Sequence, residues 1–122
     1  VGVFSNVHQG PQGISRLNTI PLNPGMILSV EPGVYLEGKL GIRLENLVYV
    51  KKKRGNNRRK KEFLEFETLT LVPFEKKLIE KNLLSRDELH WLNSYHYNVY
   101  NKLSPFLNVS EKTWLRDACR IL

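Results

Sequence analysis

An antiparallel β-hairpin centred on Gly38 is predicted by the apolar pattern of the first half of the chain. Residues 26–30 are apolar and β-prone, and residues 40–50 form a second run rich in Leu, Ile, Val and Tyr. If the chain folds about Gly38, positions whose numbers sum to 76 lie opposite each other. Glu31 would then face Glu45, with Cβ atoms about 4.5–5.5 Å apart.

Further strands are predicted on both sides of this hairpin. Residues 1–7 alternate loosely, and residues 66–71 alternate apolar side chains with Glu and Thr, as a half-buried strand requires. The run 63–72 is expected to pair with residues 40–50. Residues 51–62 would then form a long hairpin loop between the two strands.

The last third of the chain has a helical pattern. Residues 76–84 predict a short amphipathic helix, and Ser85 with Glu88 matches a capping box. Apolar residues at spacings of three and four then predict a helix of about five turns that ends at Ser104-Pro105. Ser110 is expected to cap a shorter helix. The apolar positions of these two helices are Leu89, Leu92, Tyr95, Val99 and Leu103, then Trp114, Leu115, Ala118 and Leu122.

The order of the elements predicts an α+β fold, an antiparallel sheet followed by helices. The 122 residues suffice for one modest domain, which we divide into residues 1–72 and 73–122. The first residue is Val1 rather than Met, and it lies inside a predicted strand. We therefore expect the chain to be a fragment of a longer protein.

The net charge of +7 comes from one segment. Residues 51–62 hold eight of the 19 Lys and Arg and one of the 12 Asp and Glu, so the rest of the chain is neutral. Such a run could bind phosphates or serve as a nuclear address. No aromatic residue within it could stack on bases, and a solvated loop insertion is the favoured interpretation.

A cytoplasmic location is expected from what the sequence contains. No apolar run approaches the roughly 20 residues of a membrane span, and no signal peptide is visible. Cys119 is the single cysteine, so an intrachain disulfide is excluded, which fits a reducing compartment. Membrane partners are not expected.

The facing carboxylates of Glu31 and Glu45 are the first candidate for chemistry, because two like charges repel unless a positive group lies near them. Arg43 shares the strand face of Glu45 and could neutralise one carboxylate, whereas one or two divalent metal ions could neutralise both. His8, before a glycine-rich loop, could assist acid–base chemistry. In the simpler alternatives, Glu31 caps a turn, Glu45 pairs with Arg43 in solvent, or Pro32 inserts a bulge that shifts the register.

Three segments give this arrangement a family resemblance. Residues 6–15, 24–35 and 41–46 resemble aminopeptidase P, an Xaa-Pro aminopeptidase of the creatinase and methionine aminopeptidase superfamily with a pita-bread fold. The C-terminal extension of the large, eukaryotic-type enzymes is also matched. Its matching segments are residues 63–73, 83–85, 91–96 and 103–105.

The resemblance implies a metallopeptidase that releases the N-terminal residue when proline follows it, through a water activated by two metal ions. Mn²⁺ is the expected metal, with Zn²⁺ or Co²⁺ as alternatives. By resemblance, Glu31 and Glu45 are metal ligands and Glu31 also moves a proton. His8 helps to hold the substrate and stabilise the transition state, and Arg43 orients Glu45. The expected partners are proline-containing peptides and a second copy bound through the C-terminal extension.

The departures from the family pattern leave an alternative open. The two aspartate ligands and the metal-binding histidine have no counterpart in this sequence, so the chain alone is expected to be inactive. Gln9 replaces the usual glutamate, and Val30 replaces the usual asparagine or aspartate. The alternative is a non-catalytic binding module of the same fold. A nucleic-acid-binding domain acting through residues 51–62 is less favoured.

Five residues of the long helix complete the candidates. His90 and His96 are six residues apart and do not share a helix face, so we expect surface or packing roles. Trp91, Tyr95 and Tyr97 could form a dimer contact or pack within the chain, and the sequence favours neither.

Overall fold

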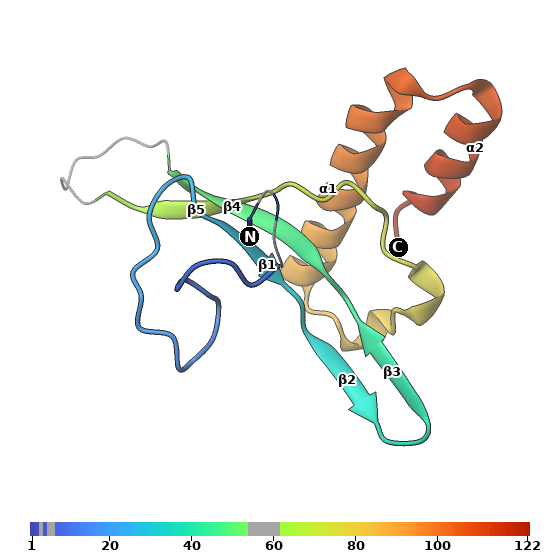
Figure 1. Cartoon of the computed structure of the whole chain (residues 1–122). Helices are drawn as coiled ribbons and strands as arrows, with labels where there is room; N and C mark the ends of the chain where they lie inside the picture. Colours follow the sequence, from blue (N-terminus) through green and yellow to red (C-terminus); the bar gives the residue numbers. More distant parts are fainter. Residues whose placement is uncertain (3, 5–6, 54–61) are drawn as a thin grey trace. The chain divides into compact units, whose positions relative to one another are not determined.

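The computed structural model describes residues 1, 2, 4, 7–53 and 62–122. The chain divides into two compact units, Val1–Thr70 and Leu71–Leu122. Strands build the first unit and helices build most of the second (Figure 1), which confirms the predicted α+β class.

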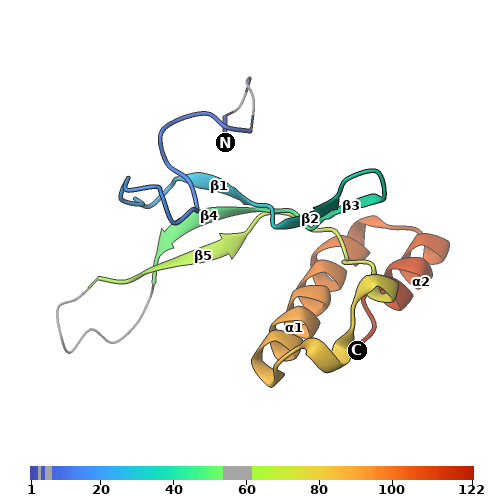
Figure 2. The ribbon, with the colours of Figure 1, turned by 90° about the horizontal axis from the view of Figure 1, so that it is seen from below.

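The described part of the first unit contains five strands. They are β1 (Ile27–Val30), β2 (Gly33–Leu36), β3 (Leu40–Arg43), β4 (Asn46–Lys52) and β5 (Leu64–Thr68). β1, β4 and β5 form an antiparallel sheet in the order β1-β4-β5, and β2 pairs with β3 in a separate antiparallel ladder. Figure 2 shows this ladder extending from the ends of β1 and β4.

The predicted turn and register of the hairpin are confirmed. Gly38 has a φ of +67°, a conformation that glycine adopts without steric cost, and the Lys39 N–H donates to the Leu36 carbonyl at 3.0 Å. Leu28 pairs with Val48 in one ladder and Val34 with Ile42 in the other. Both pairs sum to 76, so Pro32 has not shifted the register.

Two strand predictions were wrong in their extent. Residues 40–50 form two strands instead of one, with a break at Leu44 and Glu45 opposite Pro32, whose nitrogen has no hydrogen to donate to a ladder. In the expected strand 1–7, the described positions 1, 2, 4 and 7 are not in a strand, and positions 3, 5 and 6 lie outside the described residues. The Val1 ammonium donates to the Ile27 carbonyl at 2.9 Å, a single contact in place of a ladder.

The predicted pairing of the runs before and after the basic segment is confirmed. β4 and β5 are antiparallel, with Val48 opposite Thr68 and Val50 opposite Phe66. The expected loop of residues 51–62 was too long, because Lys51 and Lys52 continue β4. The rest of that loop prediction falls mainly on residues 54–61, which lie outside the described part of the chain.

The small core of the first unit lies on one face of the sheet. Leu28, Val48 and Val50 are buried, and Leu22 and Met26 pack against them. Side chains alternate between the two faces of a strand, so the residues that flank this core along β1 and β4 point away from it.

The second unit contains α1 (Arg86–Leu103) and α2 (Val109–Ala118). As predicted, Ser85 and Glu88 form a capping box, and α1 ends at Leu103 before Pro105. The buried core consists of Tyr95, Val99 and Leu115, surrounded by partly buried apolar side chains from both helices and the segment before them. No helix in the described part of the chain has the length and apolarity that crossing a membrane requires.

Three helical predictions need correction: the short helix over residues 76–84, the burial of Trp114 and the residue that caps α2. The short helix expected over residues 76–84 is replaced by two separate 3₁₀ turns, η1 (Lys76–Leu78) and η2 (Lys81–Leu83). The Glu75 and Glu80 carboxylates each accept a backbone N–H of the turn that follows, so each 3₁₀ turn begins with its own cap. A third 3₁₀ turn, η3 (Ser104–Phe106), follows α1. Trp114, expected on the buried face of α2, is 66% exposed.

Asn108, and not Ser110, caps α2. The Asn108 side chain accepts the Glu111 N–H at 3.0 Å, and the Glu111 carboxylate accepts the Asn108 N–H at 2.9 Å. We predict that Asn108→Ala lowers the free energy of unfolding by about 0.5–2 kcal/mol. Ser110→Ala is the matched control and is expected to have little effect. Urea denaturation of both variants checks this, and a larger loss for Ser110→Ala would contradict it.

The aromatic residues of α1 divide between the interior and the surface. Tyr95 is buried, and its hydroxyl donates to the Val72 carbonyl at 2.8 Å. Trp91 stacks on Tyr95 with ring centres 5.5 Å apart but is 53% exposed, and Tyr97 is 70% exposed. Packing within the chain therefore accounts for Tyr95, while Trp91 and Tyr97 present surface to solvent.

The two histidines of α1 have the predicted surface and packing positions. His90 is exposed and His96 is fully buried. His96 Nε2 accepts the Phe74 N–H at 3.1 Å, and its Nδ1 has no hydrogen-bond partner among the described residues. Burial lowers the pKa of His96, and the nearby charge of Lys76 lowers it further. The imidazole is therefore held neutral in the interior.

Candidate functional site

Glu31 and Glu45 occupy opposite positions in the gap between the two ladders. Val30 pairs with Asn46 before the gap and Gly33 pairs with Arg43 after it. Within the gap, the Leu44 N–H donates to the Pro32 carbonyl at 3.0 Å, so the register continues through it. The register on both sides of the gap therefore places Glu31 and Glu45 at facing positions along the hairpin.

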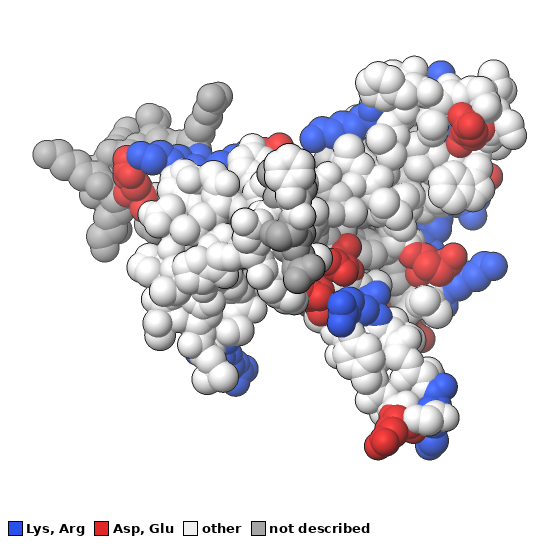
Figure 3. All heavy atoms as spheres, viewed as in Figure 1, with Lys and Arg blue, Asp and Glu red and all other residues white. Residues whose placement is uncertain are grey.

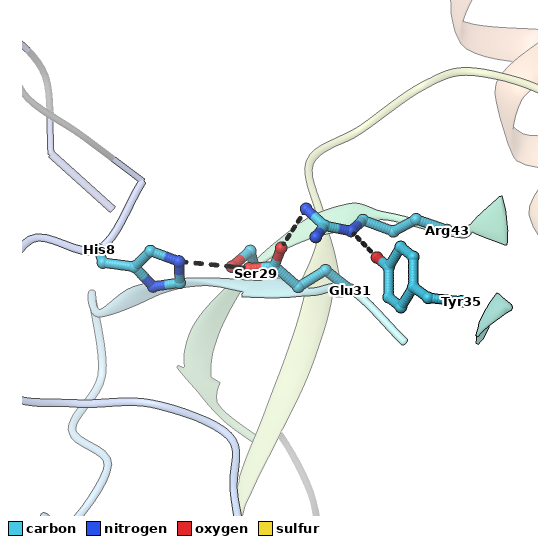
Figure 4. A network of polar contacts seen from close by, with 5 residues as sticks. All are labelled: His8, Ser29, Glu31, Tyr35 and Arg43. Carbon is cyan, nitrogen blue, oxygen red and sulfur yellow. Dashed lines mark hydrogen bonds and ion pairs between the residues drawn. The ribbon is translucent and has the colours of Figure 1, made fainter. Parts of the chain in front are cut away.

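The Glu31 carboxylate is held at both oxygens (Figure 4). The Ser29 hydroxyl donates to Oε1 at 2.7 Å, and Arg43 Nη1 donates to Oε2 at 2.9 Å. His8 Nε2 lies 3.9 Å from Oε1. The Glu31 side chain is 23% exposed, so these contacts are partly shielded from water.

Arg43 links Glu31 to Tyr35. Its Nε donates to the Tyr35 hydroxyl at 2.7 Å, and the guanidinium carbon lies 5.8 Å from the centre of the Tyr35 ring. The hydrogen bond to Tyr35 raises the pKa of Arg43 above its ordinary value, and the charges of Tyr35, Glu31 and Glu45 add to this effect. Arg43 therefore remains a cation beside the Glu31 carboxylate and the Tyr35 hydroxyl.

The contact of Arg43 differs from the expected one. The family resemblance implies that Arg43 orients Glu45, whereas its ion pair in the structure is with Glu31. Glu45 is exposed and takes no part in the hydrogen bonds of Figure 4. Arg43 pairs with Gly33 at the end of β3, so Glu31, two residues before Gly33, is its diagonal neighbour and lies within reach of its long side chain.

Ser29 and Tyr35 also belong to the site, although neither was predicted; the sequence contains a signal for each. Ser29 is two residues before Glu31, so an extended chain places both on one face. Tyr35 pairs with Gly41 and is therefore the diagonal neighbour of Arg43 across the β2–β3 ladder. Diagonal neighbours are within reach of long side chains.

A pocket of about 540 Å³ lies beside this network. His8, Gln9 and Gly10 line it from the loop before β1, Ser29 lines it from β1, and Glu31 lines it from the position after β1. The His8 side chain is 84% exposed, so its imidazole is accessible from solvent. The pocket therefore brings a titratable imidazole and a carboxylate to a common cavity.

Charged side chains of both signs lie on the surface of the described part of the chain. On the face viewed in Figure 3, positive and negative side chains are interspersed and uncharged atoms cover most of the area. Lys51 pairs with Glu65 and Glu67 of β5, and Lys52 pairs with Glu62, so these two lysines of the basic segment have acidic partners.

The donor chemistry of the site fits hard divalent cations, whereas the number of donors is small. Glu31 and Glu45 offer carboxylate oxygens and His8 an imidazole, which Mn²⁺ and similar ions accept. Within residues 1, 2, 4, 7–53 and 62–122, no group of three or more His, Cys, Asp or Glu side chains could hold a metal ion. Two carboxylates and one Arg leave one net negative charge, which favours a cation.

Comparison with known families assigns both parts of the chain. Residues 1–52 match the model described as metallopeptidase family M24. Residues 62–122 match the model described as the C-terminal region of peptidase M24.

Known relatives match almost the whole chain but are much longer. A probable Xaa-Pro aminopeptidase P of Botryotinia fuckeliana is 45% identical over 94% of this chain and 18% of its own length. Aminopeptidase P2 of Arabidopsis thaliana is 45% identical over 100% of this chain and 18% of its own length. The chain thus spans about a fifth of the length of the curated relatives it matches.

A solved structure has the same fold. It is X-prolyl aminopeptidase from Caenorhabditis elegans, described as a cytosolic enzyme with a di-nuclear active site. The TM-score is 0.84 and the identity 35%, over 96% of this chain and 20% of the other. The arrangement of antiparallel strands followed by helices is therefore that of the C. elegans protein over the matched region.

Proposed function

Because this chain belongs to metallopeptidase family M24, we propose that it forms the C-terminal part of a metal-dependent aminopeptidase. The substrates would be peptides with proline in the second position, from which the enzyme releases the first residue. The names of its relatives support this reaction, and so does the di-nuclear active site of the structurally similar enzyme.

In this proposal, residues 1–72 complete a catalytic domain and residues 73–122 form its C-terminal extension. The two family matches, 1–52 and 62–122, support a division near the end of the sheet. A catalytic domain of the relatives' size would supply further metal ligands, since the chain spans about a fifth of their length.

Glu31 and Glu45 are the proposed metal ligands of this chain, and two Mn²⁺ ions are the proposed cofactors, with Zn²⁺ or Co²⁺ as alternatives. When bound, such ions supply Lewis-acid chemistry, because they polarise a carbonyl and lower the pKa of a water. The facing positions of the two glutamates in the hairpin support a shared role.

The other residues act on the substrate and on Glu31. His8 lines the pocket with an exposed imidazole, and its proposed role is to hold the peptide and stabilise the transition state. Glu31 Oε1 faces His8 and the pocket, so it is the proposed oxygen for proton transfer. Arg43 keeps the carboxylate in place through Oε2.

Location and assembly are further parts of the proposal. A cytoplasmic enzyme is supported by the cytosolic description of the C. elegans protein. A homodimer through the C-terminal extension is supported by the exposed faces of Trp91 and Tyr97, which lie on one helix. Nucleic acid is not a proposed partner.

The observation that carries the proposal is that Glu31, which the register places opposite Glu45, lines a pocket together with His8. Its test is the release of the first residue from an Arg-Pro-Pro peptide by the full-length protein, with and without added Mn²⁺. We predict Mn²⁺-dependent activity that is lost in Glu45→Ala, because a carboxylate ligand is removed.

The matched control is Glu37→Ala, which removes an exposed carboxylate at the hairpin turn and should leave activity unchanged. Absence of activity in the folded, Mn²⁺-supplied protein would favour the non-catalytic binding module instead. Equal activity of Glu45→Ala and the wild type would remove Glu45 from the metal site.

A further inference from the structure

We infer that Ser29 is a positioning residue for Glu31, a role that rests on the proposed function and extends it. Its hydroxyl donates a 2.7 Å hydrogen bond to Oε1, the oxygen that also faces His8. A short O–H···O⁻ bond is among the stronger hydrogen bonds in proteins. Ser29 thereby fixes the direction in which Glu31 presents its carboxylate.

Lone-pair counting shows why this contact is compatible with a ligand role. An ionised carboxylate has about four acceptor sites, two on each oxygen. Ser29 occupies one site on Oε1 and Arg43 occupies one on Oε2. About one site then remains on each oxygen, so the carboxylate can bind cations through both oxygens while its orientation stays fixed.

Two anchors hold Glu31 better than one. With Arg43 alone, the carboxylate could rotate about the bond to its single anchored oxygen, and a flexible Glu side chain loses considerable entropy when a ligand orders it. Sites in which supporting hydrogen bonds lock the ligand side chains bind metals more tightly. The Ser29 hydroxyl therefore contributes to affinity without touching the metal.

The fold makes position 29 suitable for this role. Leu28 points into the core of the sheet, and the period of two turns Ser29 and Glu31 to the other face. Ser29 is half-buried and lines the same pocket as Glu31. A small side chain there leaves the cavity open, and a slightly larger one could extend into it.

Paired variants with the same shape separate hydrogen bonding from packing. Ser29→Thr keeps the hydroxyl and adds a methyl group. Ser29→Val has nearly the same volume as Ser29→Thr but carries a methyl group in place of the hydroxyl. In the full-length protein, we expect the Mn²⁺ dissociation constant of Ser29→Val to rise about 10–100-fold, as for other residues that orient metal ligands. Ser29→Thr should retain the affinity of the wild type.

Isothermal titration with Mn²⁺ alone measures the affinities, and the Mn²⁺ concentration for half-maximal peptidase activity gives a second readout. Excess Mn²⁺ should restore activity to Ser29→Val, which a general folding defect would not allow. Ser29→Ala removes only the oxygen and provides the same comparison if Val at this position prevents folding.

The outcomes distinguish this inference from the proposed function. A wild type that binds Mn²⁺ and cleaves the peptide, with equal affinities in Ser29→Thr, Ser29→Val and Ser29→Ala, overturns the role of Ser29 alone. An equal loss of Mn²⁺ affinity in Ser29→Thr and Ser29→Val, with normal affinity in Ser29→Ala, also overturns this role, because the added methyl group would then be the cause. A wild type that binds no Mn²⁺ overturns both.

Discussion

Glu31→Gln is expected to lower kcat/KM of the full-length protein for an Xaa-Pro peptide by at least about 100-fold. Mutating a residue that merely orients a metal ligand lowers metal affinity or activity about 10–100-fold, and mutating a ligand itself should lower it by no less. Glutamine preserves the length of the side chain but removes its negative charge. The Ser29 hydroxyl and Arg43 both donate to Glu31. A glutamine amide would turn its own N–H group toward one of them, so that two donors would face each other.

The control for this variant is Glu37→Gln, which makes the same chemical change at the exposed turn. Steady-state kinetics at saturating Mn²⁺ and the Mn²⁺ affinity of each variant would be measured together. We expect Glu37→Gln to match the wild type in both. Wild-type kinetics in Glu31→Gln would exclude Glu31 from metal binding and from proton transfer.

Leu115→Ala is expected to reduce the free energy of unfolding of the helical unit by about 2–5 kcal/mol. Leu115 is 2% exposed and packs with Tyr95 and Val99 of α1. The unit has a small core, so the resulting cavity cannot be filled without moving a helix. The lost burial and the cavity both contribute to the cost.

Trp114→Ala is the matched control, because it removes a larger side chain from the adjacent, exposed position of α2. Both tryptophans of the chain are in the second unit, and Trp91 stacks on Tyr95 of the core. Urea denaturation followed by Trp91 fluorescence and helical circular dichroism therefore reports on this unit in both variants. A greater loss in Trp114→Ala would contradict the assigned core.

The hairpin was predictable because its determinants are local. Gly38 fixes the turn by adopting a positive φ, and alternating apolar residues then determine the pairing up to Tyr49. The cap of α1 was predictable for the same reason, since Ser85 and Glu88 satisfy each other's backbone groups. In these cases, the residues that decide the structure are close in sequence.

The incorrect predictions involve competition between similar signals. Asn108 and Ser110 are both good caps, and Glu111 at the third position of the helix selects Asn108. Residues 76–84 have a helical pattern, but Glu75 and Glu80 favour separate turns. In each case, a carboxylate and a backbone N–H decide the boundary, and apolar periodicity does not detect them.

The candidate site was predictable in its positions but not in its contacts. Counting around Gly38 brought Glu31 and Glu45 together, and the motif resemblance selected His8 and Arg43. Both partners of Arg43, Glu31 and Tyr35, are its diagonal neighbours across the hairpin rather than its neighbours along the strand. Such contacts depend on side-chain rotamers and strand ends, which a sequence pattern does not encode. The catalytic and metal-binding roles stay predictions.

The continuous register of the hairpin also restricts how related sequences can vary in length. A residue gained in β2 alone would turn the outer side chains of the hairpin to the opposite face or open a bulge, and Tyr35 would lose its diagonal position beside Arg43. One residue gained in each arm beyond Tyr35 would lengthen the hairpin and leave this contact intact. Insertions and deletions in this region should therefore occur in matched pairs across the turn.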